Sequence, residues 1–164
     1  MKKQKKSIGN VIVMVAFCFM VFVVAFGGIG NSKAAGGDYE DKAWSFNLSV
    51  NDTSYKFTQH YRKYTNSAIY FNWQMSYGTL SAIEVSPYAY DGSYKAAGEF
   101  DKSTNTNSFK SYKVSNTGQY MVTNYVFEMD EENEACLALR GVTGGGTAFG
   151  QMSPDCLGSY PRLY

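Results

Sequence analysis

Apolar and polar residues alternate along several short stretches of this chain. The pattern first appears from Trp44 to Val50, and residues 55–61 repeat it after turn residues at 51–53. Successive side chains of a β-strand point to opposite faces of a sheet, so a period of two predicts strands that are buried on one face. We expect these two stretches to pair as a hairpin.

A third and longer strand is predicted at residues 69–77, where every second residue is apolar. Its opposite face carries Tyr70 among polar residues, so we expect Tyr70 to point outward. The apolar face holds Ile69, Phe71, Trp73, Met75 and Tyr77.

Proline and glycine residues divide the next part of the chain. Pro87 has no N–H to donate to a strand ladder, so it predicts an edge or a strand end. The pair Asp91-Gly92 is a strong tight-turn signal and predicts a hairpin between residues 88–90 and 94–97.

Two other stretches lack the strand pattern. Residues 101–108 are rich in Ser, Thr and Asn and predict a loop before a shorter strand at 109–114. Three glycines at 144–146 and the sequence Ser-Pro-Asp at 153–155 predict an irregular tail, and no helix-period segment follows residue 35.

The clearest pairing prediction joins residues 120–129 to residues 135–139 across the polar stretch 130–134. A register in which Phe127 faces Leu137 gives both strands one apolar face, whereas a slip of one residue would mix charged and apolar side chains. We therefore expect a hairpin here.

Short strands at this spacing, with turns rich in Gly, Asn and Asp, indicate an all-β protein built as a β-sandwich or a distorted barrel. We expect a single antiparallel β-sandwich of seven to nine short strands over residues 43–164. Residues 35–42 are expected to be a flexible N-terminal segment.

The first 34 residues have the order of a secretory signal peptide. Four lysines lie within the first six residues, an apolar run follows at 11–26, and small residues at 32–35 offer a cleavage site after Ala34. We expect an N-terminal signal helix over residues 1–34 and a secreted protein. An uncleaved membrane anchor is the alternative, since the apolar run approaches the length of a spanning helix.

The net charge of the chain after position 34 narrows the classes of partner that we expect. All 14 acidic residues but only 10 of the 15 basic ones lie after position 34, so residues 35–164 carry a formal net charge of −4. An acidic domain without a Lys/Arg cluster does not favour nucleic acid or anionic lipid. We expect no nucleic-acid partner and no membrane contact after signal cleavage.

Two cysteines, Cys136 and Cys156, remain after cleavage. In the predicted hairpin Cys136 points away from the apolar face, where the returning tail could bring Cys156 to it. An even pair in an exported chain favours a Cys136–Cys156 disulfide over a metal or redox site, and two free thiols are the alternative.

No catalytic or cofactor-binding pattern stands out. His60 is the only histidine and lies on the polar face of its strand, which disfavours a Ser-His-Asp triad and a zinc site. The acidic stretch 130–134 lacks the spacing of a calcium-binding loop, and the glycines at 144–146 lack the Lys-Ser/Thr of a phosphate loop. We expect no enzyme activity, no metal and no cofactor.

Aromatic residues are unusually frequent in this chain. All 14 tyrosines follow position 34. Tyr70, Tyr88 and Tyr90 fall on predicted outward faces and form a candidate contact surface for sugar rings or for a protein. The alternative is that tyrosine is simply favoured in strands.

Four stretches resemble a family of small exported proteins of Gram-positive bacteria, known only as a domain of unknown function. They are residues 63–70, 122–128, 135–140 and 150–156, the last similar to the family's closing Gly-x-Trp-Ser-Pro-Asp. Met152 stands where the family has Trp. The resemblance implies export and a compact β-domain, and it implies no activity.

The sequence therefore predicts a secreted, non-enzymatic β-sandwich that acts by surface contact at the cell envelope or outside the cell, with cell-wall glycan or a surface protein as its partner. A bacteriocin-like antagonist of other bacteria is an alternative, which the negative charge disfavours because membrane-active peptides are usually basic. A hydrolase of envelope glycans is the weaker alternative.

Overall fold

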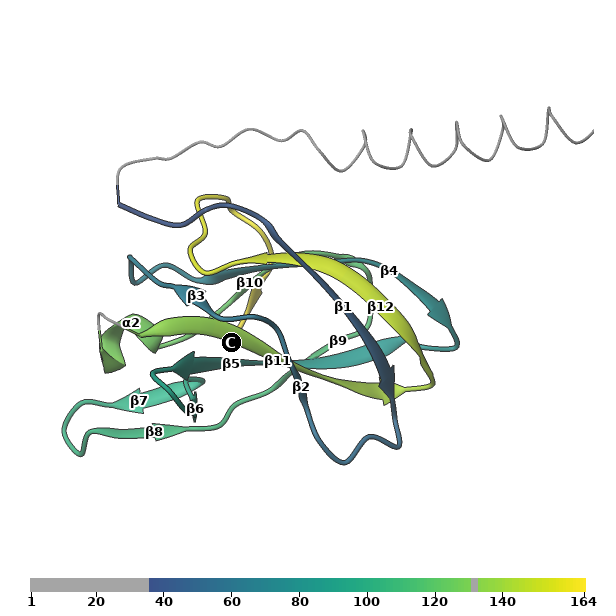
Figure 1. The fold of residues 1–164 in the computed structure, drawn as a ribbon, viewed down its shortest axis with the longest axis horizontal. Coiled ribbons are helices and arrows are strands. Elements are labelled where there is room, and N and C mark those ends of the chain that lie inside the picture. Colours follow the sequence, from purple (N-terminus) through teal and green to yellow (C-terminus); the bar gives the residue numbers. More distant parts are fainter. Residues whose placement is uncertain (1–35, 131–132) are drawn as a thin grey trace, which may run out of the picture. The chain divides into compact units, whose positions relative to one another are not determined.

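The computed structural model describes residues 36–130 and 133–164. The predicted signal peptide at 1–34 lies outside the described residues. Within them the secondary structure is almost entirely β, with one short helix, α2 (Val126–Met129), as Figure 1 shows. No helix in this part of the chain has the length and apolar character needed to cross a membrane.

One sheet, here called sheet A, has five strands in the order β1-β12-β4-β10-β13. Its neighbours are antiparallel except for β10 and β13, which pair in parallel. The strands are β1 (Lys42–Ser49), β4 (Ile69–Gly78), β10 (Gly118–Val122), β12 (Gly145–Ser153) and β13 (Arg162–Leu163).

The second sheet, sheet B, has the order β2-β11-β5-β6, with β3 also paired to β11 and β9 to β5, all antiparallel. These strands are β2 (Lys56–Phe57), β3 (Tyr61–Arg62), β5 (Ala82–Tyr90), β6 (Tyr94–Ala96), β9 (Tyr112–Val114) and β11 (Glu134–Thr143). A separate hairpin joins β7 (Glu99–Asp101) to β8 (Thr106–Ser108).

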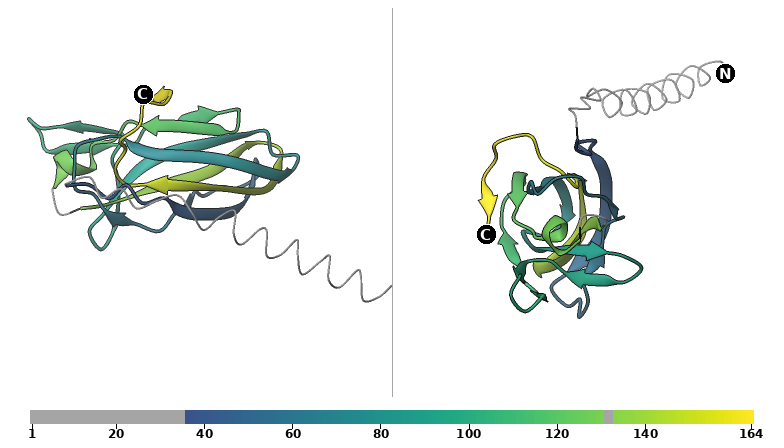
Figure 2. Two further views of the ribbon diagram at one scale, coloured as in Figure 1. Left: turned by 90° about the horizontal axis from the view of Figure 1, so that it is seen from above. Right: turned by 90° about the vertical axis from the view of Figure 1, so that its left-hand side faces the viewer.

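Side chains from both sheets meet in one hydrophobic cluster. Figure 2 shows the long strands of the two sheets running beside one another, which brings alternate side chains of each into this cluster. Sheet A contributes Trp44, Leu48, Phe71 and Trp73, and sheet B contributes Ile83, Val85, Leu137 and Leu139.

The apolar residues of β4 belong to the hydrophobic cluster only as far as Trp73. The pairing of β12 with β4 shifts register between Phe149 and Gly150, so no residue of β12 pairs with Gln74, which forms a bulge. Beyond the bulge, Met75 and Tyr77 are 42% and 57% exposed. The prediction that all five apolar residues of this strand share one buried face is thus wrong for the last two.

The glycine-rich tail is irregular only in part: Gly144 forms a bend and residues 154–161 lack a strand, but residues 145–153 form β12 in the interior of sheet A. Gly150 lies against the indole ring of Trp44, where an added Cβ would come within 2.5 Å of the ring and 1.9 Å of the Asn72 carbonyl oxygen. A residue without a side chain therefore allows Trp44 to pack flat over the strand.

The predicted hairpin between residues 120–129 and 135–139 is wrong. β10 pairs with β4 in sheet A, and the chain then crosses through α2 to β11 in sheet B. Asn124, which is 6% exposed, fixes this crossing: its amide donates to the Ser67 carbonyl (3.2 Å), and its carbonyl accepts from the Val126 N–H (3.3 Å). A side chain that bonds to the local backbone competes with a strand ladder.

The predicted hairpin between 43–50 and 55–61 is also wrong, because β1 pairs with β12 and β2 with β11. The turn between them is confirmed, since the Asp52 carboxylate accepts a hydrogen bond from the Ser49 N–H at 2.8 Å. A turn residue fixes a change of direction but does not fix the partner of the next strand.

The Asp91-Gly92 turn is confirmed, because Tyr90 pairs with Tyr94 and Gly92 has φ +104°. Pro87 lies within β5 and not at its end. It falls between the residues that pair with β9 and those that pair with β6, so its missing N–H interrupts neither ladder. The polar stretch 101–108, predicted as a loop, forms much of the β7–β8 hairpin.

Candidate functional site

The outward face of sheet B carries a continuous series of rings, here called the aromatic face. Its members come from β2, β5, β6 and the loops beside them. They are Tyr55, Phe57, His60, Tyr88, Tyr90, Tyr94 and Phe109.

Each ring of the aromatic face contacts the next. The closest pairs are stacked: His60 on Tyr90, with ring centroids 3.9 Å apart, and Phe57 on Tyr94, at 4.1 Å. The remaining contacts are edge-on or tilted, namely Phe57–Tyr88 (5.0 Å), Tyr90–Tyr94 (5.0 Å), Tyr55–Phe109 (5.7 Å) and Tyr88–Phe109 (6.4 Å). Such offset and edge-on pairs are the arrangements that aromatic quadrupoles favour.

Small side chains on the central strands allow the rings to lie across the sheet. Cys136 pairs with Tyr88, and Ala138 pairs with Phe57 on one side and Ser86 on the other. The two β11 residues are 0% exposed but do not belong to the core cluster, which places them on the outward face under the rings.

Polar groups border the aromatic face at both ends. The Glu84 carboxylate accepts hydrogen bonds from the Tyr55 hydroxyl (2.8 Å) and the Arg140 guanidinium (2.6 Å), and Arg140 also lies over the Tyr55 ring. At the other end the His60 imidazole contacts the Glu134 carboxylate. The surface thus combines apolar ring faces with oriented donors and acceptors.

Access to the rings is uneven. Tyr94 and Phe109 are 46% and 49% exposed, whereas Tyr88 and Tyr90 are half-buried. Tyr94 and Phe109 are therefore the members that a ligand would cover first.

Of the three tyrosines predicted to form a contact surface, Tyr88 and Tyr90 lie on the aromatic face and Tyr70 does not. Tyr70 is in β4 of sheet A, is 8% exposed and packs against Tyr160. Burial and the Asp41 carboxylate raise the pKa of Tyr70 to about 12. Alternation placed it on the outward face, but it could not reveal that the C-terminal tail covers that face.

His60, predicted to be a solvated surface group, takes part in the aromatic face. Its neighbours are Tyr90 from β5 and Glu134 from β11, which are distant in sequence. No local pattern in the sequence marks this contact.

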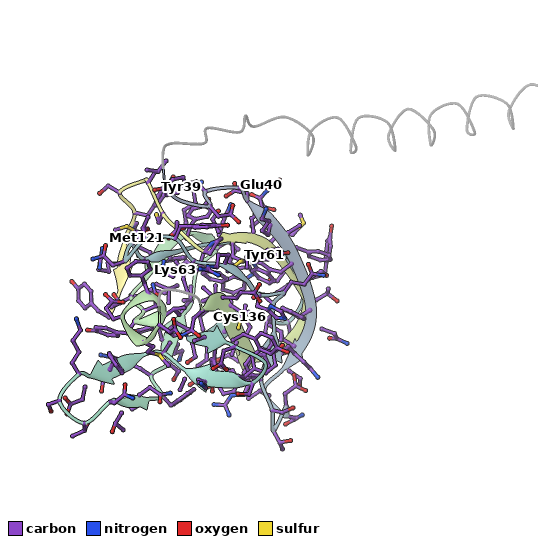
Figure 3. All side chains as sticks on the ribbon, turned by 60° about the vertical axis from the view of Figure 1, so that its left-hand side comes forward. Tyr39, Glu40, Tyr61, Lys63, Met121 and Cys136 are labelled. Carbon is purple, nitrogen blue, oxygen red and sulfur yellow. The ribbon has the colours of Figure 1, made fainter. Side chains whose placement is uncertain are left out.

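Cys136 and Cys156 are free thiols in this structure, so the predicted disulfide is not formed. Cys136 faces outward from sheet B, as predicted, but rings cover it, and burial raises the pKa of its thiol to about 12. Cys156 lies near Lys63, and its backbone N–H donates to the Ser67 hydroxyl (3.1 Å). Figure 3 labels Lys63 and Cys136 at different places in the fold, so Cys156, which lies near Lys63, is apart from Cys136.

No local pattern in the sequence marks the buried ion pair of Lys63 with Asp155. Both side chains are 0% exposed, and Lys63 Nζ lies 3.2 Å from Asp155 Oδ1. Lys63 follows β3 and Asp155 follows β12, so only the tertiary fold brings them together.

A shallow open pocket lies beside the β7–β8 hairpin. Glu99 and Lys110 form an ion pair on its wall (3.3 Å), and Tyr125 and Tyr164 complete it. Among the described residues no group of three or more His, Cys, Asp or Glu side chains is arranged to hold a metal ion.

Comparisons with protein-family models, with curated proteins and with solved structures found no match to this chain. The proposal that follows therefore rests on the residues and contacts described above.

Proposed function

We propose that this is a secreted, non-enzymatic β-sandwich protein that acts by surface contact at the cell envelope, with the aromatic face as its contact surface. The observation that carries the proposal is the unbroken series of seven rings on the outward face of sheet B, bordered by polar side chains. Export rests on the signal-like residues 1–34.

The sandwich is our interpretation of the two sheets. Sheet A and sheet B supply alternate side chains to one hydrophobic cluster, which is the arrangement of two sheets packed face to face. In such a sandwich the outward face of sheet B is free to meet a partner.

We infer that the partner is a wall glycan. Sugar rings present flat C–H faces that pack on aromatic rings, while their hydroxyls need donors and acceptors at the edge of the contact. The aromatic face offers both, with Tyr94 and Phe109 as exposed rings and Glu84, Arg140 and Glu134 beside them.

Membership of the family of small exported Gram-positive proteins remains a proposal. Two of the stretches that carry the resemblance, 63–70 and 150–156, are far apart in sequence but meet through Asp155, which accepts hydrogen bonds from the N–H groups of Tyr64 and Thr65.

A co-sedimentation assay tests the proposal. The protein, in the form released by an expressing Gram-positive host, is mixed with isolated wall sacculi, with intact cells and with sacculi digested by a muramidase. We expect retention on intact sacculi and on cells, and release when the glycan strands are cut.

Retention that persists after digestion of the glycan would assign the contact to a protein or a wall polymer instead. Complete recovery in the supernatant in every arm would contradict surface contact at the envelope. Turnover of the sacculi by the purified protein would contradict the non-enzymatic assignment.

A further inference from the structure

The Lys63–Asp155 pair is enclosed to a degree that is unusual for two opposite charges. Both side chains are fully buried, and Lys63 Nζ also donates to the Pro154 carbonyl oxygen at 2.6 Å. Taking a lysine and an aspartate out of water is costly unless their contacts are excellent, and burial lowers the pKa of Lys63 despite its acidic neighbour. The pair therefore places the Lys63 nitrogen against the Asp155 carboxyl group in a fully buried site.

The two oxygens of Asp155 have different surroundings. Oδ2 accepts from the backbone N–H groups of Asp38 (2.9 Å) and Tyr64 (3.1 Å). Oδ1, the oxygen nearest to Lys63, accepts from the hydroxyls of Thr65 (2.7 Å) and Ser67 (3.3 Å) and from the Thr65 N–H (3.1 Å).

A third ionisable group belongs to the same site. Glu128, in α2, is close enough to Lys63 to act on its charge. The Glu128 Oε2 atom is buried and has no hydrogen-bond partner among the described residues. A carboxylate oxygen without a donor is available to accept a proton.

We propose that Lys63 and Asp155 become joined by an intramolecular amide bond between Nζ and Cγ, with Glu128 as the proton carrier. The reaction is a condensation of an amine with a carboxylic acid. It needs no oxidant, no cofactor and no second molecule, and this inference does not depend on the proposed glycan contact.

The condensation forms one C–N bond and releases one water molecule. With Lys63 as a neutral amine and the Asp155 carboxyl protonated, the Nζ lone pair attacks Cγ and a C–N bond forms. Glu128 takes the proton that leaves Nζ and passes it to the departing hydroxyl, and the C–O bond breaks to release one water.

The hydrogen bonds around Asp155 favour the steps of this reaction. The N–H groups of Asp38 and Tyr64 stabilise the charge that develops on Oδ2, as in an oxyanion hole. The hydroxyls of Thr65 and Ser67 can hold the water formed from Oδ1, and the product N–H keeps the Pro154 carbonyl as its acceptor.

One feature of the site opposes the reaction. Burial raises the pKa of Asp155, but the Lys63 ammonium, the Thr65 hydroxyl and the backbone donors outweigh this and hold the pKa below its usual value. Protonation of Asp155 is then the difficult step, so we expect slow maturation of the folded protein rather than rapid closure.

Peptide mass spectrometry tests the bond directly. The full chain is folded, verified by a cooperative thermal transition, incubated overnight, then denatured and digested with trypsin. The bond blocks cleavage after Lys63, so we expect peptide 63–95 joined to peptide 141–162, with a mass one water molecule below the sum of the two. Recovery of peptides 64–95 and 141–162 only as separate species would overturn the proposal.

Two test variants, each with a control, distinguish an amide bond from an ion pair between Lys63 and Asp155. Lys63→Arg keeps the positive charge but cannot form the amide, so the linked peptide disappears, whereas Lys110→Arg, at a partly exposed ion pair, leaves it unchanged. Glu128→Gln is expected to reduce the linked fraction at least tenfold in protein that still folds, and Glu99→Gln serves as its control. Equal linkage in Glu128→Gln would overturn the role of Glu128.

Discussion

Phe57 and Tyr94 stack with ring centroids 4.1 Å apart, although they come from β2 and β6, the two ends of the strand order in sheet B. On the outward face, both side chains point from the sheet edges toward the central strands, where they lie over small residues such as Cys136 and Ala138. The outward face of sheet B is therefore a layer of rings with a buried thiol beneath it.

This layer predicts different reactivity for the two cysteines. In native protein at about pH 8, iodoacetamide should label Cys156 and leave Cys136 unlabelled, since the Cys136 thiol is 0% exposed and its pKa is raised to about 12. Phe57→Ala should expose Cys136 and increase its labelling rate at least tenfold.

Labelling is measured for each cysteine by mass spectrometry of the peptides, with Tyr77→Ala on sheet A as the control variant. Equal labelling of Cys136 and Cys156 in the unchanged protein, or a peptide pair linked by a disulfide between them, would contradict the arrangement.

Gly150→Ala is expected to lower the free energy of unfolding by about 3 kcal/mol or more, because the new methyl group meets the Asn72 carbonyl and the Trp44 ring. Gly145→Ala in the same strand is the control, since its Cβ finds only ordinary contacts near 3.6 Å. Urea denaturation of both variants measures the difference. A similar loss of stability in the two would show that strand propensity, and not the contact with Trp44, limits this position.

Asn124→Ala is expected to destabilise the protein by about 1–3 kcal/mol, because it leaves the Ser67 carbonyl and the Val126 N–H without their partner in a buried site. Asn116→Ala, in an exposed loop, should change the free energy of unfolding by less than about 0.5 kcal/mol. If chemical denaturation gives the same small change for both, Asn124 does not fix the crossing between the sheets.

The raised pKa of Tyr70 predicts that the free energy of unfolding falls in alkali. The folded protein holds the pKa of Tyr70 at about 12, while an unfolded tyrosine ionises near about pH 10. In this window the unfolded chain releases a proton that the folded chain retains, so stability falls as the pH rises. We expect Tyr70→Phe to reduce this fall by about 1 kcal/mol between about pH 9 and about pH 11.

Unfolding free energies at the two pH values, with Tyr164→Phe as the exposed control, measure the effect. An unchanged pH dependence in Tyr70→Phe would mean that Tyr70 is as accessible in the fold as in the unfolded chain.

The sequence predicted which residues form strands better than which strands pair. β1 and β4 were found from the alternation of Trp44–Val50 and of residues 69–77, because alternation reports one buried face directly. Their partner β12 was missed, since its glycines serve the close approach of Trp44 and leave no alternating pattern to read.

The hairpin predicted around residues 130–134 failed for a related reason. Phe127 and Leu137 do lie in apolar-periodic segments, but Asn124 and α2 turn the chain from one sheet to the other between them. Pairing depends on contacts that only the tertiary fold decides.

Candidate site residues were predicted in part. Tyr88 and Tyr90 point outward, as a period of two predicts, but the same rule could not show that the C-terminal tail covers Tyr70. Lys63 and Asp155 were missed as a site because a local pattern carries no information on a contact between residues so far apart in sequence.

In the proposed function, the aromatic face makes the contact with the envelope. Binding of the released protein to purified sacculi is measured by titration for the unchanged chain, for Tyr94→Ala with Phe109→Ala, and for Tyr77→Ala, an exposed ring on sheet A. We expect a loss of affinity of at least tenfold in the double variant, with thermal unfolding still cooperative, and an unchanged affinity in Tyr77→Ala. Equal binding by all three proteins would contradict this proposal.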